Sequence, residues 1–295
     1  IIILLHLPSV QRFVGAQVAD ALAKKLGTKV RIERVDLGFL NHFIVDGLVI
    51  DDQNGKQMAK ASRVAAQVDL LSLVNGDKVR ISSAQIFGLN AQLYRATPDA
   101  KANFQFVIDS LKSRDTTHQT PLDLRIQSLI IRHGNVRYDL LSAPATPNRL
   151  NFNHLNVSNI SAHINLNTLT DNRTDINVRN LSFAEASGLD VRNLRLHLKA
   201  NKQLAEISNL LVQLPQSKIN VPAYKVRFND KSKGFNFATA HHLLRIEKSY
   251  LTPSDIACLL PSLQTFNQKL YLNTNVSGTA NQLKIKMLAL RYGNN

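Results

Sequence analysis

Residues 29–37, with the sequence KVRIERVDL, set the expected fold of this chain. The apolar residues stand at Val30, Ile32, Val35 and Leu37, and polar residues occupy the positions between them. This alternation predicts a β-strand with one apolar face. The step of three residues from Ile32 to Val35 predicts an extra residue in the strand, as a β-bulge supplies, or a bend between two short strands.

The same spacing of i, i+2, i+5 and i+7 recurs along the chain. It begins again at Val79, Leu150, Leu155, Ile176 and Leu189, and looser copies begin at Phe43, Leu124, Ala205, Ile219 and Leu283. About one such window is expected by chance in a chain that is 44% hydrophobic. Turn signals separate the segments, at Asn54-Gly55, Asn75-Gly76, His133-Gly134-Asn135 and Ser187-Gly188. The expected fold is therefore mainly β: a long, twisted, largely antiparallel sheet with few short helices.

Residues 9–27 differ, because their apolar side chains recur every three or four positions. Ser9 suits a helix N-cap, Gly27 suits the residue that ends a helix, and Lys24 and Lys25 complement the dipole of its last turn. We therefore expect an amphipathic helix over 9–27 and a repetitive β region over 28–295. Within the β region, the stretches near 112–121 and 142–149 are candidate points of subdivision.

The first eight residues, IIILLHLP, are strongly apolar. As a helix they would reach only about 10 Å, whereas the hydrocarbon core of a bilayer is about 30 Å thick. We interpret them as the end of a truncated transmembrane anchor. A buried first strand or helical turn is the alternative.

The repeated apolar face must be covered by another apolar surface. A second sheet, closure into a barrel, or a trough filled by lipid tails would each satisfy it, and periodicity does not distinguish them. For the trough, we expect the lining to come from the apolar phase of the strands: Val30, Ile32, Val35, Leu37, Val79, Ile81, Ile86, Leu124, Ile126, Leu150, Phe152, Leu155, Val157, Ile176, Val178, Leu181, Phe183, Val191, Leu194 and Leu196.

The chain is basic, with 36 Lys and Arg against 21 Asp and Glu, a formal net charge of +15. This charge favours an anionic partner, either nucleic acid or phospholipid headgroups. Basic residues are scattered singly, and the aromatic residues mostly share the apolar phase, so we expect no nucleic-acid partner. The candidates for headgroup contact lie near the N-terminus: Arg12, Lys24, Lys25 and Lys29.

Patterns typical of enzymes are missing from the sequence. There is no phosphate-binding glycine loop, no GxSxG turn, and no metal-binding spacing among the nine histidines and the lone Cys258. Asp51 and Asp52 precede Gln53-Asn54-Gly55 and indicate a hairpin turn rather than an acid/base pair. We expect no catalytic residue, no metal, no cofactor and no enzymatic activity.

Several stretches resemble the N-terminal part of TamB-type proteins of the AsmA-like (bridge-like lipid transfer) superfamily. The resemblance covers most of the chain and rests on strand-like segments rather than on an invariant motif. The stretches are residues 7–11 (LPSVQ), 23–30 (AKKLGTKV), 43–52 (FIVDGLVIDD), 103–109 (NFQFVID), 129–139 (LIIRHGNVRYD), and 251–255 with 260–263 (LTPSD, LPSL).

The resemblance implies a location and an activity. Such proteins are anchored in the inner membrane of Gram-negative bacteria by a single span, and most of the chain lies in the periplasm as a sheet curled into an open groove. They are implicated in phospholipid transport to the outer membrane and, with an Omp85-type outer-membrane β-barrel partner, in assembly of surface proteins. Compared with that family, we expect this chain to be an N-terminal fragment, with an incomplete anchor and without the family's C-terminal domain. The competing interpretations are a structural β-domain with a dry core that acts as a tether or docking surface and, less favoured, a nucleic-acid-binding β-domain.

Overall fold

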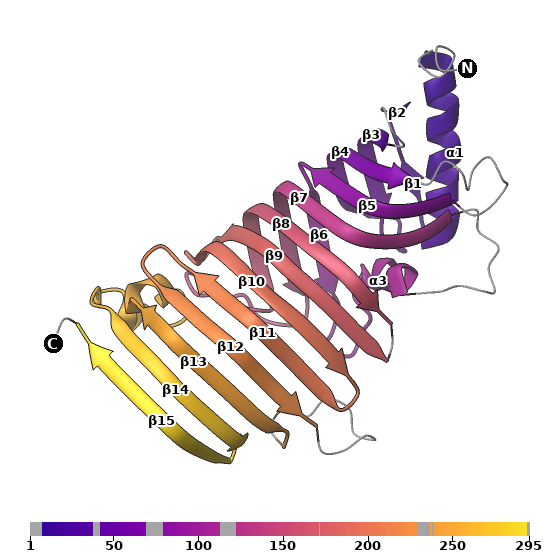
Figure 1. Ribbon diagram of the computed structural model, residues 1–295. Coiled ribbons are helices and arrows are strands. Elements are labelled where there is room, and N and C mark those ends of the chain that lie inside the picture. The colour runs from indigo at the N-terminus through magenta and orange to yellow at the C-terminus, as the bar shows by residue number, and fades with distance from the viewer. Residues whose placement is uncertain are drawn as a thin grey trace. The chain divides into compact units, whose positions relative to one another are not determined.

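The computed structural model describes residues 8–37, 42–68, 79–112, 122–170, 172–228, 237 and 239–293. They form a mainly β structure with few helices, as the sequence predicts (Figure 1). The chain divides into two compact units. Unit 1 contains residues 1–145 and 151–161, and unit 2 contains residues 146–150 and 162–295.

The described residues of unit 1 form two helices and a mixed sheet. Its elements are α1 (Pro8–Leu26), β1 (Val30–Arg31), β2 (Arg34–Leu37), β3 (His42–Asp51), β4 (Gln57–Val68), β5 (Val79–Phe87), β6 (Asn90–Arg95), α3 (Gln105–Lys112), β7 (Leu122–Leu140) and the first half of β8 (His154–Leu169). Most pairs are antiparallel, but β5 and β6 both pair with β7 in parallel. A parallel pair needs a long crossover, and the connection from β6 to β7 contains α3.

Unit 2 is an antiparallel meander in which each strand pairs with the next along the chain (Figure 1). After the second half of β8, its strands are β9 (Arg173–Glu185), β10 (Asp190–Asn201), β11 (Leu204–Gln213), β12 (Lys218–Arg227), β13 (His241–Leu251), β14 (Leu270–Thr279) and β15 (Gln282–Tyr292). Two 3₁₀ helices, η2 (Pro253–Ile256) and η3 (Pro261–Leu263), lie between β13 and β14.

The extra residues expected from the i, i+2, i+5, i+7 spacing are present. On β9 the step from Val178 to Leu181 is three residues, whereas the step between their partners on β10, Leu196 and Leu194, is two. On β10 the step from Val191 to Leu194 is three residues, whereas their partners on β9 are two apart. Both steps are therefore β-bulges. The step of three in residues 29–37 is instead a bend between two short strands, because β1 ends before Ile32 and β2 begins after Glu33.

Left-handed backbone accompanies these irregularities. Asn159, Asn209 and Lys248 have φ between 48° and 54° inside β8, β11 and β13. At Asn209 and Lys248 the neighbouring register slips by one residue. Asparagine tolerates this conformation better than most residues, so two of the three sites suit the backbone that a bulge requires.

The expected turn at His133-Gly134-Asn135 is wrong. These residues lie inside the continuous strand β7, and His133 has φ 55°. Gly134 is needed for close packing instead, since a Cβ there would lie 3.0 Å from Ile131 Cγ2 and 3.2 Å from Ile160 Cβ. The turns at Asn54-Gly55 and Ser187-Gly188 are confirmed, and Asn75-Gly76 lies outside the described residues.

Helix α1 is confirmed within one residue of its expected ends and packs against β1 and β2. Gly15 permits the close approach, because a Cβ on it would lie 3.4 Å from Val35 Cγ2 and 3.9 Å from Ile32 Cγ2. Its amphipathic character remains a prediction, since Phe13, which belongs to the expected apolar face, is 65% exposed. The expected anchor residues, 1–8, lie almost entirely outside the described part.

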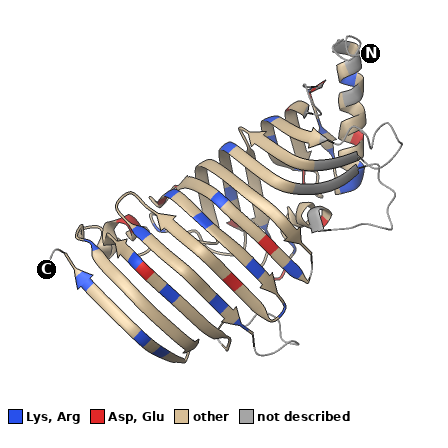
Figure 2. Cartoon of the chain, viewed as in Figure 1, with Lys and Arg blue, Asp and Glu red and all other residues tan. Residues whose placement is uncertain are grey.

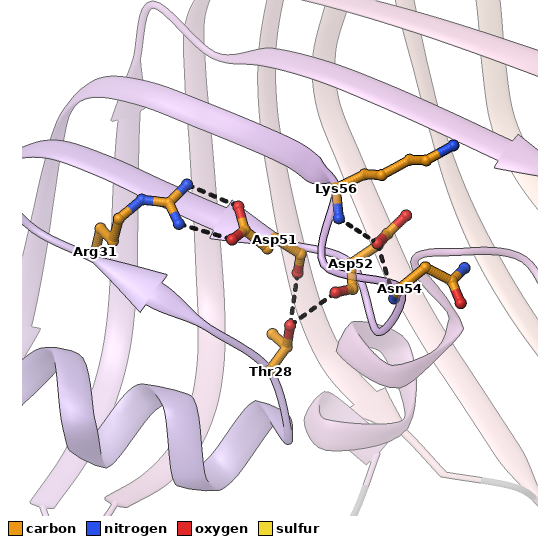
Figure 3. Close-up of polar contacts among 6 residues, drawn as sticks. All are labelled: Thr28, Arg31, Asp51, Asp52, Asn54 and Lys56. Atoms are coloured by element: carbon orange, nitrogen blue, oxygen red, sulfur yellow. Dashed lines mark hydrogen bonds and ion pairs between the residues drawn. The ribbon is translucent and has the colours of Figure 1, made fainter.

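A polar cluster joins the end of α1 to the β3–β4 hairpin (Figure 3). Thr28 Oγ1 donates to the backbone oxygens of Asp51 and Asp52 at 2.9 and 3.0 Å, and Arg31 holds the Asp51 carboxylate with two hydrogen bonds. The Asp52 carboxylate accepts from the backbone N–H groups of Asn54 and Lys56 at 2.9 Å each. The expected hairpin turn at Asp51-Asp52 is therefore confirmed.

Candidate functional site

One face of unit 2 is lined by apolar side chains in cross-strand register. From β9 to β15, each residue of the row Ile176, Leu198, Ile207, Tyr224, Leu244, Val276 and Ile285 is the direct partner of the next. We call this the central row. Residues two positions away along a strand share its face, or three positions away where a bulge intervenes, and so do their cross-strand partners. Together these residues form the apolar face of unit 2.

The side chains of the central row are not sealed in a core. From Ile176 to Val276 they are half-buried, and Ile285 is 56% exposed. In a sheet packed on a second layer, such residues would be almost fully buried. The described residues of unit 2 provide one cluster of buried apolar side chains, formed by Val226, Phe228 and Ala240 near one end of the face.

The structure brings together the predicted lining residues of unit 2. Four cross-strand pairs form between β9 and β10: Ile176 with Leu198, Val178 with Leu196, Leu181 with Leu194, and Phe183 with Val191. Seven of these eight residues were expected lining residues. Val191 is buried, and the others are half-buried. All of the expected lining residues in β9 and β10 thus share one face.

In unit 1 the predicted residues Val30, Ile32 and Val35 lie beneath α1. Val35 is 1% exposed and Val30 is 8% exposed. Val35 begins an apolar row that continues through Val45, Val64 and Ile86 to Ile131 on β7. The helix covers the start of this row, whereas Ile86 further along it is half-buried.

The remaining predicted residues divide into three groups. The side chains of Leu37, Val79, Ile81, Leu124 and Ile126 lie outside the described part, although the backbone pairs Ile81 with Leu124. Leu155 and Val157 lie half-buried in β8. The strand expected from Leu150 is wrong at its beginning: Phe152 lies in a turn and is 70% exposed, because Asn153 N donates to Asn151 Oδ1 and closes that turn.

The structure separates Arg12 from the other headgroup candidates. Arg12 and Lys24 are exposed on α1, and their separation of twelve positions corresponds to about 18 Å of helix. Lys24 and Lys25 lie in the last turn, and Lys29 is exposed just before β1. Lys25 is half-buried, and its carbonyl accepts a hydrogen bond from Ser110 Oγ at 3.5 Å.

The candidate set missed the continuation of the apolar face onto β11–β15. Leu244 and Val276 lie in the central row without appearing among the expected residues, and Leu288 and Leu290 lie on the same face of β15. A signal was present: Ala205, Ile207, Leu210 and Val212 repeat the diagnostic spacing. Alanine, threonine and tyrosine within these strands weaken the pattern.

One end of the unit 2 sheet is closed by polar contacts of the β13–β14 connection. Asp255 Oδ2 accepts from Gln216 N at 2.8 Å and from Ser217 Oγ at 2.6 Å, and Thr252, which is fully buried, donates to Gln216 O. Cys258 is buried beside Ser187, and burial raises the pKa of its thiol. These groups stabilise the turns and leave the apolar face as the candidate site.

No protein-family model, no curated protein and no solved structure matches this chain. Among the described residues, neither α1 nor α3 has the length and apolarity needed to cross a membrane. Within the same part of the chain, no group of three or more His, Cys, Asp or Glu side chains is placed to hold a metal ion.

Proposed function

We propose that this chain carries phospholipid acyl chains on the apolar face of its sheet. In this proposal it belongs to an inner-membrane-anchored periplasmic protein of TamB type, which moves phospholipid between the inner and outer membranes of a Gram-negative envelope. The anchor, the location and assistance to surface-protein assembly by an Omp85-type barrel partner follow from the sequence resemblance. The half-buried central row is the observation that carries the lipid proposal.

The physical argument rests on uncovered apolar surface. Each acyl CH₂ group that leaves water for an apolar surface gains about 0.8 kcal/mol, with no requirement for a particular chain. The central row offers such a surface from β9 to β15, because its members are aliphatic except Tyr224, whose hydroxyl is hydrogen-bonded to His242 Nδ1. The face therefore suits a ligand with a long hydrocarbon part and little need for specific polar contacts.

A dry structural core is the competing function. It requires the apolar side chains to pack on one another or on a second layer. The half-burial of Leu198, Ile207 and Leu244 favours the lipid proposal over this alternative, since these residues retain solvent-accessible surface.

Site-specific photocrosslinking tests the proposal. Protein that carries a photoreactive residue at Leu194 or Leu198 is purified without detergent and then irradiated. It should form adducts with co-purified phospholipid, because both positions lie on the apolar face. The matched controls are Arg195 and Lys199, their exposed neighbours on the opposite face. Adducts at the apolar positions, absent from the controls, support the proposal. Protein free of lipid adducts at Leu194 and Leu198 contradicts it and favours the dry structural domain.

A further inference from the structure

The polar face of unit 2 carries a row of cationic and aromatic side chains near the end of the strands. Asn193, Gln213, Lys218, Tyr250, Tyr271 and Arg291 are successive cross-strand partners from β10 to β15. Each residue neighbours a residue of the apolar face along its own strand, so the row lies on the opposite side of the sheet. We call it the basic–tyrosine row.

Two cations contact the tyrosine rings: Arg291 of the row, and Lys269, which immediately precedes β14 and which we count with the row from here on. Lys269 Nζ lies 4.6 Å from the centre of the Tyr250 ring, and Arg291 Cζ lies 4.4 Å from the centre of the Tyr271 ring. The two ring centres are 6.0 Å apart. In the described part of the chain, no carboxylate forms an ion pair with Lys218, Lys269 or Arg291. Among the described residues, these three exposed positive charges therefore have no ion-pair partner.

Unit 2 as a whole has few carboxylates to offer. It contains 18 Lys and Arg against 8 Asp and Glu, a formal net charge of +10. In Figure 2, Lys and Arg positions outnumber Asp and Glu positions along its strands.

The described carboxylates of unit 2 are already engaged. Four bind basic side chains: Asp175 binds His197, Asp190 binds Arg192, Glu206 binds Lys225, and Glu247 binds Arg245. Asp255 and Glu185 hold turns through Ser217 and Ser187. Neutralisation of the basic–tyrosine row therefore has to come from outside these groups.

We propose that the basic–tyrosine row of unit 2 binds the phosphate groups of an anionic phospholipid bilayer surface. Tyrosine, lysine and arginine are the side chains that anchor proteins at the headgroup level, because each combines an apolar body with a polar or charged tip. The charges extend over adjacent strands, so a surface with many phosphates complements them better than one small anion. This docking uses the face opposite the acyl-chain site and does not depend on it.

A single-stranded nucleic acid is the other polyanion to consider. Its sequence-independent binding relies on bases that stack on open aromatic faces. In the basic–tyrosine row, each ring has a cation on one face and lies beside the other tyrosine. Base stacking would have to displace these contacts, whereas phosphate binding to Lys218, Lys269 and Arg291 leaves them in place.

Vesicle co-sedimentation of the full chain tests the inference. The wild type should bind vesicles of phosphatidylglycerol and phosphatidylcholine, lose binding in high salt, and bind pure phosphatidylcholine weakly. The variant Lys218→Gln/Lys269→Gln/Arg291→Gln should bind less tightly by about fivefold for each charge removed. Replacing Lys218 and Lys269 by arginine should preserve binding.

The matched control is Arg192→Gln/Lys225→Gln/Arg245→Gln. It removes the same formal charge from the same sheet, but from cations that already hold carboxylates. It should weaken binding clearly less than the first variant. Equal loss in the two variants, equal binding to anionic and neutral vesicles, or binding to single-stranded RNA with none to vesicles would each overturn the inference. Far-ultraviolet circular dichroism establishes that each variant is folded.

Discussion

Strands with the same apolar spacing differ in burial at the two ends of the described chain. At the start of unit 1, Val35 lies beneath α1 and is 1% exposed; on β15 of unit 2, Leu290 belongs to the same kind of pattern and is 61% exposed. Both residues have an apolar cross-strand partner, Val45 and Leu272 respectively. The alternation therefore specifies which face of a strand is apolar. Whether that face is buried depends on a separate covering element, such as α1 in unit 1.

The two regions also hold their structure by different means. In unit 1 a helix covers the first strands, and the cluster around Asp51 and Asp52 fixes the hairpin beside it. In β14 and β15 stability comes from the ladder of backbone pairs and from cross-strand contacts. Comparable substitutions should therefore change the free energy of unfolding by different amounts in the two regions.

The largest effect is expected at Val35. Val35→Gln places an amide in a site without a described hydrogen-bonding partner and should lower the free energy of unfolding by about 3 kcal/mol. Urea unfolding monitored by circular dichroism measures the change. A loss below about 1 kcal/mol would show that α1 does not seal this position, and the contrast with β15 would disappear.

A smaller effect is expected where the β14–β15 hairpin begins. Gly278 has φ 130°, and a Cβ there would lie 2.1 Å from Gln282 O, so Gly278→Ala should destabilise the sheet by about 2 kcal/mol. Gly55→Ala is the matched control, because Gly55 also has positive φ but no atom within 4 Å of the added Cβ. Gly55→Ala should lower the free energy of unfolding by about 1 kcal/mol. An equal loss in the two variants would contradict the importance of the close backbone approach at Gly278.

The next effect concerns the hairpin beside α1. Tyr94 Oη donates to Asp52 Oδ2 at 2.7 Å. Burial alone would raise the pKa of Asp52, but hydrogen bonds from Tyr94 and from the Lys56 and Asn54 N–H groups outweigh it and lower this pKa. Tyr94→Phe should therefore lower the free energy of unfolding at pH 7 by about 1 kcal/mol.

The pH dependence of this effect has a definite sign. An aspartate with a lowered folded pKa stabilises the fold above its usual pKa of 3.8, and the contribution is lost as pH falls through the folded pKa. The difference between wild type and Tyr94→Phe should accordingly shrink when urea unfolding is repeated near pH 3. A difference that stays constant between the two pH values would rule out the ionised Asp52 as the acceptor that matters.

The smallest effect is expected on β15. Leu290→Gln should change the free energy of unfolding by about 0.5 kcal/mol or less, because the side chain is already exposed to water. The measurement is the same urea series used for Val35→Gln, so the pair compares one replacement in the two regions. A loss near 3 kcal/mol would mean that the apolar face of β15 is packed against something.

The sequence predicted the class of fold, helix α1 and the register irregularities, because these depend on local spacing and capping. The extra residues near Val178 and Val191 could be read from steps of three between apolar positions. The parallel pairing of β5 and β6 with β7 could not be predicted from the sequence, since it depends on a crossover connection between strands that are separated along the chain. His133 suggested a turn but lies in a continuous strand, where neighbouring strand pairs override the local Gly-Asn signal.

The candidate site was predicted in part, for a related reason. Periodicity placed the expected residues of β9 and β10 on one face, and cross-strand pairing confirms that placement. Periodicity could not show that α1 covers Val35 or that a turn exposes Phe152. It also carried no information about the basic–tyrosine row, because Lys218, Tyr250, Tyr271 and Arg291 become neighbours only when four strands pair.

The most direct test of the central claim is mass spectrometry of lipid extracted from the full chain after purification without detergent. The wild type should retain phospholipid, and Leu198→Asp/Leu244→Asp, which places charges in the central row, should lose most of it. Arg195→Asp/Arg227→Asp, on the opposite face, should retain the wild-type amount. A wild-type protein without lipid, or equal lipid in the two variants, would contradict an acyl-chain site on the apolar face.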